Sequence, residues 1–198
     1  MGISDRQEAL LESLRPFVAA AMAENDPAHD VAHVQRVVKL SRQLCHESGA
    51  DPFRTELLAW VHDLSDDKLA SNLGATSIEA YFVQIGVKKE DIQFVLDAIP
   101  YISYRKHPKL SPDIPLEIRI VQDADRMDAM GAIGIARTFA YGGAKGRSLA
   151  DSLAHFDEKL LKLYDLLSTD AAKNLARERH AFLMEFYQRF RTEGDLQS

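Results

Sequence analysis

The 198-residue sequence predicts an all-α protein, a bundle of helices packed around a hydrophobic core. Nearly every segment repeats its apolar residues at three- and four-residue steps, which is the period of an amphipathic helix. No segment shows sustained alternation of apolar and polar residues bounded by hairpin turns, the pattern of half-buried strands. A hydrophobic content of 46% over this length suits one full-sized core. We therefore expect a single domain that spans residues 1–198.

Capping residues place the helices of the N-terminal half. Asp51 followed by Pro52 is a typical helix start, because aspartate caps the free N–H groups and proline fits the first turn. Asn25, Asp26 and Pro27 separate the first two helices, and Gly86 ends a later one. The expected helices are 5–24, 30–48, 51–64, 76–85 and 88–101.

The C-terminal half begins with a proline-rich segment, RKHPKLSPDIP at 105–115, which is expected to be a loop. A helix from about residue 115 carries VQDADRM, and the small apolar run AMGAIGIARTFAY is expected to be buried. YGGAKGR at 141–147 resembles a glycine-rich basic loop, and 150–191 predicts two or three amphipathic helices. The aromatic residues of the last helix could pack into the core or form a dimer face, and we favour the core.

Composition excludes several classes of function. The net charge of −6 and the pI of about 5.6 do not fit a general nucleic-acid binder. Cys45 is the single cysteine, so the chain forms no internal disulfide and no thiolate zinc site. The N-terminus lacks the apolar core of a signal peptide, and the longest apolar stretches are too short to span a membrane. We expect a cytoplasmic protein without nucleic-acid or membrane partners.

Histidines and acids fall on three helices that also carry core residues. His33 lies four residues before an apolar valine, and His62 with Asp63 ends the apolar run LLAWV. Asp123 and Asp125 lie among apolar residues of RIVQDADRM. Burying carboxylates costs free energy unless a cation or strong hydrogen bonds compensate. Adjacent side chains point about 100° apart, but both can reach an ion in the gap between helices of a bundle.

Each of these residues also has a structural interpretation. A histidine at a helix boundary is more often structural than a ligand, and Asp63 could be a polar cap. Asp123 and Asp125 could bond backbone groups or pair with Arg119 and Arg126. From the residues alone, a site for a divalent ion such as Mn²⁺, Fe²⁺, Ni²⁺, Mg²⁺ or Zn²⁺ and a purely structural role both stay open.

The order H…HD…D on helices resembles the HD superfamily of metal-dependent phosphohydrolases. HDVAHVQRV resembles its first-histidine motif, LLAWVHD its HD motif, and VQDADRMDAMGAIGIARTFAYGG its final-aspartate segment. This long last segment is similar to the small stand-alone bacterial branch of YedJ-like and YpgQ-like proteins. The resemblance covers about residues 25–190, with the motif core at 25–130 and the helices of 150–191 in the same domain. It implies an HD-domain helical bundle with a metal site in its interior.

The resemblance implies that one divalent ion, with manganese favoured, is held by four residues: His33, His62, Asp63 and Asp125. Asp125 is preferred to Asp123 because the family's acid precedes a basic residue, as Asp125 precedes Arg126. Asp123 is left as a supporting residue or an alternative ligand. A second metal is not expected, because it would need further histidines and the sequence has only one histidine, His107, between Asp63 and Asp123.

The implied reaction is hydrolysis of nucleotides, and among them release of pyrophosphate from nucleoside triphosphates by attack of a metal-bound water on phosphorus. Asp66 or Asp67 would orient or deprotonate the water, and Arg36, Lys68 and Arg126 would neutralise phosphate charge. The basic residues of the glycine-rich loop could clamp distal phosphates or be solvated loop charges; they are Lys145 and Arg147.

The sequence also leaves alternative functions open. The enzyme could act on nucleoside monophosphates or cyclic nucleotides, or the chain could be a nucleotide-sensing module with little turnover. An oxygenase of the HD type would need a di-iron site, which the sparse histidines argue against. Whether the protein is a monomer or a homodimer does not follow from the residues.

Overall fold

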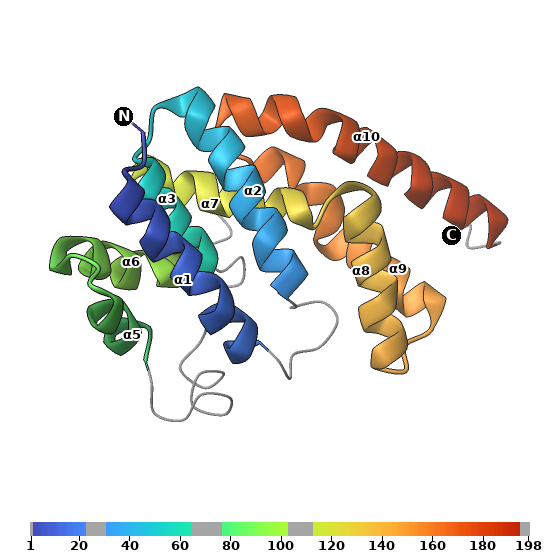
Figure 1. Cartoon of the computed structure of the whole chain (residues 1–198). Coiled ribbons are helices and arrows are strands. Elements are labelled where there is room, and N and C mark those ends of the chain that lie inside the picture. Colours follow the sequence, from blue (N-terminus) through green and yellow to red (C-terminus); the bar gives the residue numbers. More distant parts are fainter. Residues whose placement is uncertain (1, 23–30, 65–76, 103–112, 195–198) are drawn as a thin grey trace.

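The computed structural model describes residues 2–22, 31–64, 77–102 and 113–194, and its regular secondary structure there is entirely helical (Figure 1). The all-α prediction is confirmed for these ranges. The α-helices are α1 (Asp5–Ala21), α2 (Val31–Ser48), α3 (Pro52–Val61), α5 (Ile78–Ile85), α6 (Lys89–Ile102), α7 (Leu116–Asp128), α8 (Gly131–Ala144), α9 (Leu149–Glu158) and α10 (Asp170–Glu193). Two short 3-10 helices, Leu160–Lys162 and Tyr164–Leu166, connect α9 to α10.

The helix ends follow the capping signals of the sequence. The Asp51 carboxylate accepts hydrogen bonds from the backbone N–H groups of Phe53 and Arg54, and Pro52 occupies the first helical position of α3. Gly86 ends α5 with a φ of 85°, a left-handed conformation that costs glycine little. These contacts set the point at which α3 begins and therefore the position of His62 at its other end.

The centre of the bundle is formed by α2, α3 and α7, and α2 packs against both of the others. A cluster of buried apolar residues connects them to α1, α5 and α6 on one side and to α8, α9 and α10 on the other. Figure 1 shows α10 running along one edge of the molecule, beside α2 and α8. The helices α2, α3 and α7, of which α7 is distant in sequence from the other two, thus bring their side chains together in the interior.

The glycine-rich segment 141–147 differs from the expected loop, because α8 continues through its first four residues to Ala144. Gly142 is buried there, and a Cβ at this position would collide with the hydroxyl of Ser152. Close packing of α8 against α9 therefore accounts for the glycine. The helix α8 ends two residues after Gly142, at Ala144.

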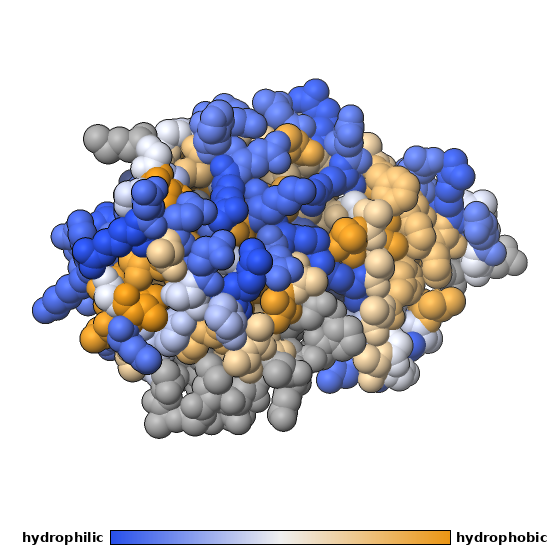
Figure 2. All heavy atoms as spheres, viewed as in Figure 1, coloured by the Kyte–Doolittle hydropathy of each residue, from blue (hydrophilic) through white to orange (hydrophobic). Residues whose placement is uncertain are grey.

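The last helix packs part of its aromatic face against the core: Phe186, Tyr187 and Phe190 are half-buried, so the choice between core and dimer face stays a prediction. Phe186 and Phe190 of α10 pack against Phe139 of α8, and Phe186 stacks on Phe156 of α9. Phe182 keeps 49% of its surface exposed. In Figure 2, hydrophobic residues gather over α8, whereas hydrophilic residues cover α2 and α10. Within the described ranges, no helix is both long enough and apolar enough to cross a membrane.

Candidate metal centre

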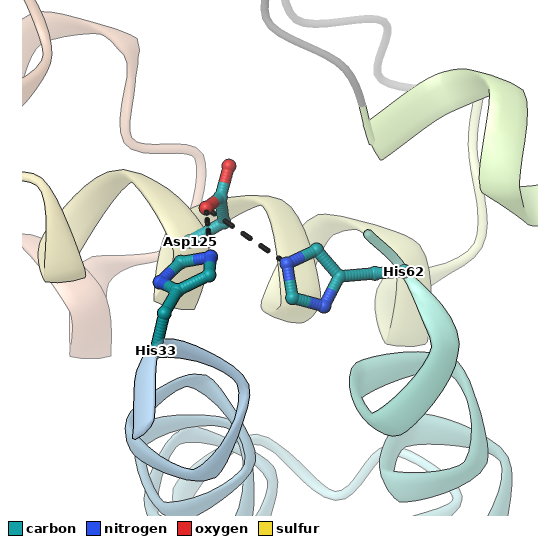
Figure 3. Close-up of side chains that lie close together, drawn as sticks. All are labelled: His33, His62 and Asp125. Atoms are coloured by element: carbon teal, nitrogen blue, oxygen red, sulfur yellow. Dashed lines mark ion pairs between the residues drawn. The ribbon is translucent and has the colours of Figure 1, made fainter. Parts of the chain in front are cut away.

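Three predicted ligands from three helices meet in the bundle interior (Figure 3). His33 comes from the first turn of α2, His62 from the end of α3, and Asp125 from α7. Nε2 of His33 lies 3.4 Å from Oδ1 of Asp125, and Nε2 of His62 lies 3.9 Å from the same oxygen. One donor atom from each residue lies within 4.8 Å of the other two, so the group could hold a metal ion.

The orientation of His62 follows from the way α3 ends. The last carbonyl groups of a helix lack intrahelical partners, and Nδ1 of His62 lies 2.8 Å from one of them, the carbonyl oxygen of Ala59. A carbonyl only accepts, so Nδ1 donates the proton and Nε2 carries the lone pair. Nε2 is buried and has no hydrogen-bond partner among the described residues. It is therefore available as a metal ligand.

His33 is oriented by a carboxylate that the sequence analysis did not single out. Nδ1 of His33 lies 2.7 Å from Oδ2 of Asp128, which is 1% exposed. Burial raises the pKa of the Asp128 carboxyl, but hydrogen bonds from His33 and Arg36 outweigh burial and hold that pKa well below its usual range. The ionised carboxylate accepts the Nδ1 proton, which directs the Nε2 lone pair of His33 toward Asp125.

The helical phase of α7 separates its three aspartates. Asp123 and Asp125 are two residues apart, about 200° around the helix, so they point to opposite sides. Asp125 faces the histidines, whereas buried Asp123 accepts hydrogen bonds from the backbone N–H and hydroxyl groups of Ser168 and Thr169. Burial raises the pKa of Asp123 although all four of these bonds lower it. Asp123 thus anchors the start of α10, and the cluster of donors contains Asp125 instead.

The donor set fits a divalent ion. Nitrogen and oxygen donors that lie about 2.0–2.2 Å from one ion are about 3–4 Å from each other, and the two separations from Asp125 fall in that range. Both histidines use Nδ1 in a hydrogen bond and present Nε2, the arrangement of ligating imidazoles in metalloproteins. Two nitrogens and a carboxylate without thiolate suit Mn²⁺, Fe²⁺, Ni²⁺ or Zn²⁺.

Other predicted residues lie near the cluster without completing it. Asp63 directly follows His62 and is half-buried, but it is not one of the donors that converge within 4.8 Å. Its ligand role stays a prediction. Arg36, one turn after His33, donates from Nε to Oδ1 of Asp128 at 2.6 Å, which places its guanidinium beside the site.

The structure does not bring Arg126 to the donors. Its side chain is buried, its Nη1 donates to the carbonyl of Leu166 at 2.8 Å, and it lies 3.8 Å from the Asp123 carboxylate. Lys145 and Arg147 are exposed, and each cation lies over the Tyr141 ring. The phosphate-binding roles of these three residues stay predictions. The remaining predicted catalytic residues, Asp66, Asp67 and Lys68, lie outside the described residues.

Asp128 and Arg137 are the site residues that sequence reasoning missed. Arg137 of α8 donates from Nη1 to Oδ2 of Asp128 at 2.6 Å. A signal for Asp128 was present, because residues three apart share a helix face and Asp128 follows Asp125 by three. The sequence gives no such signal for Arg137. It is the one charged residue of the apolar segment AMGAIGIARTFAY, and its partner Asp128 lies in another helix.

Comparisons with known proteins agree with this geometry. Residues 30–130, which contain all three donors, match the HD domain family. The chain is 41% identical to YpgQ of Bacillus subtilis over 182 residues, which cover 88% of this chain and 89% of YpgQ.

Solved structures show the same fold. The YpgQ crystal structure superposes with a TM-score of 0.79 at 36% identity, covering 94% of this chain and 96% of that one. YpgQ in complex with ADP gives a TM-score of 0.75 at 36% identity, covering 92% and 97%. An HD-superfamily hydrolase from Bacillus thuringiensis gives 0.72 at 35% identity, covering 96% and 100%. The chain therefore belongs to the HD domain family, and within the HD superfamily it is of the YpgQ type.

Proposed function

We propose that the protein is a metal-dependent phosphohydrolase of nucleotides, and that it releases pyrophosphate from nucleoside triphosphates. The observation that carries the proposal is the buried, oriented Nε2 of His62, which faces Asp125 and has no hydrogen-bond partner among the described residues. Membership of the HD family supports metal-dependent hydrolysis. The ADP bound to the similar protein YpgQ supports a nucleotide as the ligand.

His33, His62 and Asp125 would hold the ion, with Asp63 as the fourth ligand. A divalent ion in such a site lowers the pKa of a bound water and polarises a phosphoryl oxygen. Asp128 keeps His33 in the tautomer that presents Nε2, and the Ala59 carbonyl does the same for His62. Neither imidazole must reorganise when the ion binds, which favours affinity.

In the proposed reaction, the oxygen of a water molecule forms a bond to the α-phosphorus of the triphosphate. The bond between that phosphorus and the bridging α–β oxygen breaks, and its electron pair leaves with pyrophosphate. The products are a nucleoside monophosphate, pyrophosphate and a proton. We assign acceptance of the proton to Asp66 or Asp67, which follow His62 by four and five residues in the sequence, because a carboxylate can act as general base toward an attacking water.

Growing negative charge on the leaving phosphates requires cations beside the ion. Arg36 meets this requirement, because its guanidinium is fixed by Asp128 next to His33 while its side chain remains 33% exposed. Arginine binds phosphate oxygens through parallel N–H groups, which suits a transferred phosphoryl group.

The experiment is a product analysis with a panel of nucleoside mono-, di-, tri- and cyclic phosphates in the presence of Mn²⁺, Mg²⁺ or Ni²⁺. The proposal predicts monophosphate and pyrophosphate from triphosphates in equal amounts, and loss of both products in Asp63→Ala. Inorganic phosphate from monophosphates would replace the substrate assignment with that of a nucleotidase. Metal-loaded protein that turns over none of the panel would refute the proposal.

A further inference from the structure

Two arginines from different helices converge on a single buried carboxylate beside the metal centre. Arg36 of α2 donates to Asp128 from Nε at 2.6 Å and from Nη2 at 3.1 Å. Arg137 of α8 donates from Nη1 at 2.6 Å to Oδ2, the same oxygen that lies 2.7 Å from Nδ1 of His33. One carboxylate therefore fixes a predicted metal ligand and two guanidinium groups in a single arrangement.

Exposure shows which of these groups can meet a ligand. The His33 and Asp128 side chains are 3% and 1% exposed and form the floor of the centre. Asp125 is 31% exposed, Arg36 is 33% exposed and Arg137 is 19% exposed. Of these five side chains, those of Asp125, Arg36 and Arg137 thus keep contact with solvent.

We infer that Arg137 binds a phosphate group of the substrate together with Arg36, and that Asp128 positions both arginines. The inference rests on the proposed function, because it names a phosphate-binding group of the same site. It adds a residue of α8, a helix that contributes none of the metal ligands.

The arrangement suits a polyphosphate for two reasons. Guanidinium groups bind phosphate oxygens bidentately, and a guanidinium already fixed by a carboxylate loses less conformational entropy on binding. A divalent ion would add two positive charges to the two arginines, against the carboxylates of Asp63, Asp125 and Asp128. The described groups around the loaded centre therefore attract an anion.

The experiment measures binding of pyrophosphate, ADP and adenosine by calorimetry in saturating Mg²⁺, separately from turnover. Arg137→Gln is expected to weaken pyrophosphate and ADP binding about 10- to 100-fold, or about 1.4–2.7 kcal/mol, because it removes a charged hydrogen-bond donor. Adenosine binding and the Kd for Mn²⁺ should change less than about threefold. Arg189→Gln is the matched control, because the Arg189 side chain is 71% exposed on α10 and pairs with Glu185 one turn away on the same helix.

Arg137→Lys keeps a charge beside Asp128 but removes the bidentate fork, so an intermediate loss of anion affinity is expected. If Arg137→Gln does not fold, the anion affinity of Arg137→Lys tests the inference instead. The inference is overturned if both variants bind pyrophosphate as the wild type does. It is also overturned if Mn²⁺ affinity falls as much as anion affinity, because Arg137 would then be purely structural, or if the wild type binds neither anion. Pyrophosphate binding that depends on Arg137, without turnover of any triphosphate, would support the inference and refute only the proposed function.

Discussion

The Asp128→Asn substitution tests whether the buried carboxylate of α7 controls the metal centre. Asparagine has nearly the same shape, but its amide presents one acceptor oxygen and one NH₂ donor. Oδ2 of Asp128 lies within hydrogen-bond distance of nitrogens of His33, Arg36 and Arg137, and Oδ1 accepts a further bond from Arg36. Either orientation of the amide therefore opposes an NH₂ group to an N–H donor.

We expect Asp128→Asn to weaken Mn²⁺ binding about 10- to 100-fold, which is the usual effect of losing the hydrogen-bond partner of a ligating histidine. The factor corresponds to about 1.4–2.7 kcal/mol of binding free energy. The assay is a titration with Mn²⁺ in which free ion is followed by electron paramagnetic resonance.

The control for this substitution is Asp97→Asn, because Asp97 is exposed on α6 and its carboxylate accepts a hydrogen bond from Gln93 of the same helix. A folded Asp128→Asn protein with wild-type Mn²⁺ affinity would refute the role assigned to Asp128. Circular dichroism on the same samples shows whether each variant is folded.

Three further predictions concern stability. Asp123→Ala removes the four hydrogen bonds that anchor the start of α10, so unfolding free energy should fall by about 2–4 kcal/mol in a urea titration; an unchanged midpoint would contradict this. Gly134→Ala should destabilise, because a Cβ there collides with the backbone carbonyl of Ala129, whereas Gly143→Ala on the same helix meets open space and should be neutral or stabilising by up to about 1 kcal/mol. Mn²⁺ at 100 times its Kd should stabilise the wild type by about 2.7 kcal/mol, or about 5–11 °C in Tm; a shift of equal size in His62→Ala would place the ion elsewhere.

The metal donors could be predicted from the sequence because each lies on a helix with a clear apolar face. The extents of α2 and α7 follow from periodicity, and the start of α3 follows from the Asp51 cap; these helices place His33, His62 and Asp125 toward the interior. Their order along the chain is also the linear motif of the HD superfamily. Their convergence in the structure agrees with both arguments.

The partners of the donors could not be predicted in the same way. Arg126 directly follows Asp125, but neighbours on a helix point about 100° apart. Its side chain contacts the Leu166 carbonyl and lies 3.8 Å from the Asp123 carboxylate, and its predicted role toward phosphate stays a prediction. Arg137 reaches Asp128 from α8, so the contact depends on how two helices pack. Such tertiary contacts carry no local pattern in the sequence.

The most direct test of the central claim is a metal titration of chelator-treated protein, with bound ion and pyrophosphate release from a nucleoside triphosphate measured on the same samples. The account predicts no turnover without metal and a rate that rises in proportion to bound Mn²⁺ until one ion is held per chain. In His62→Ala, that tight site and the turnover should be lost together. Full turnover by metal-free protein, or turnover that survives in His62→Ala, would contradict the account.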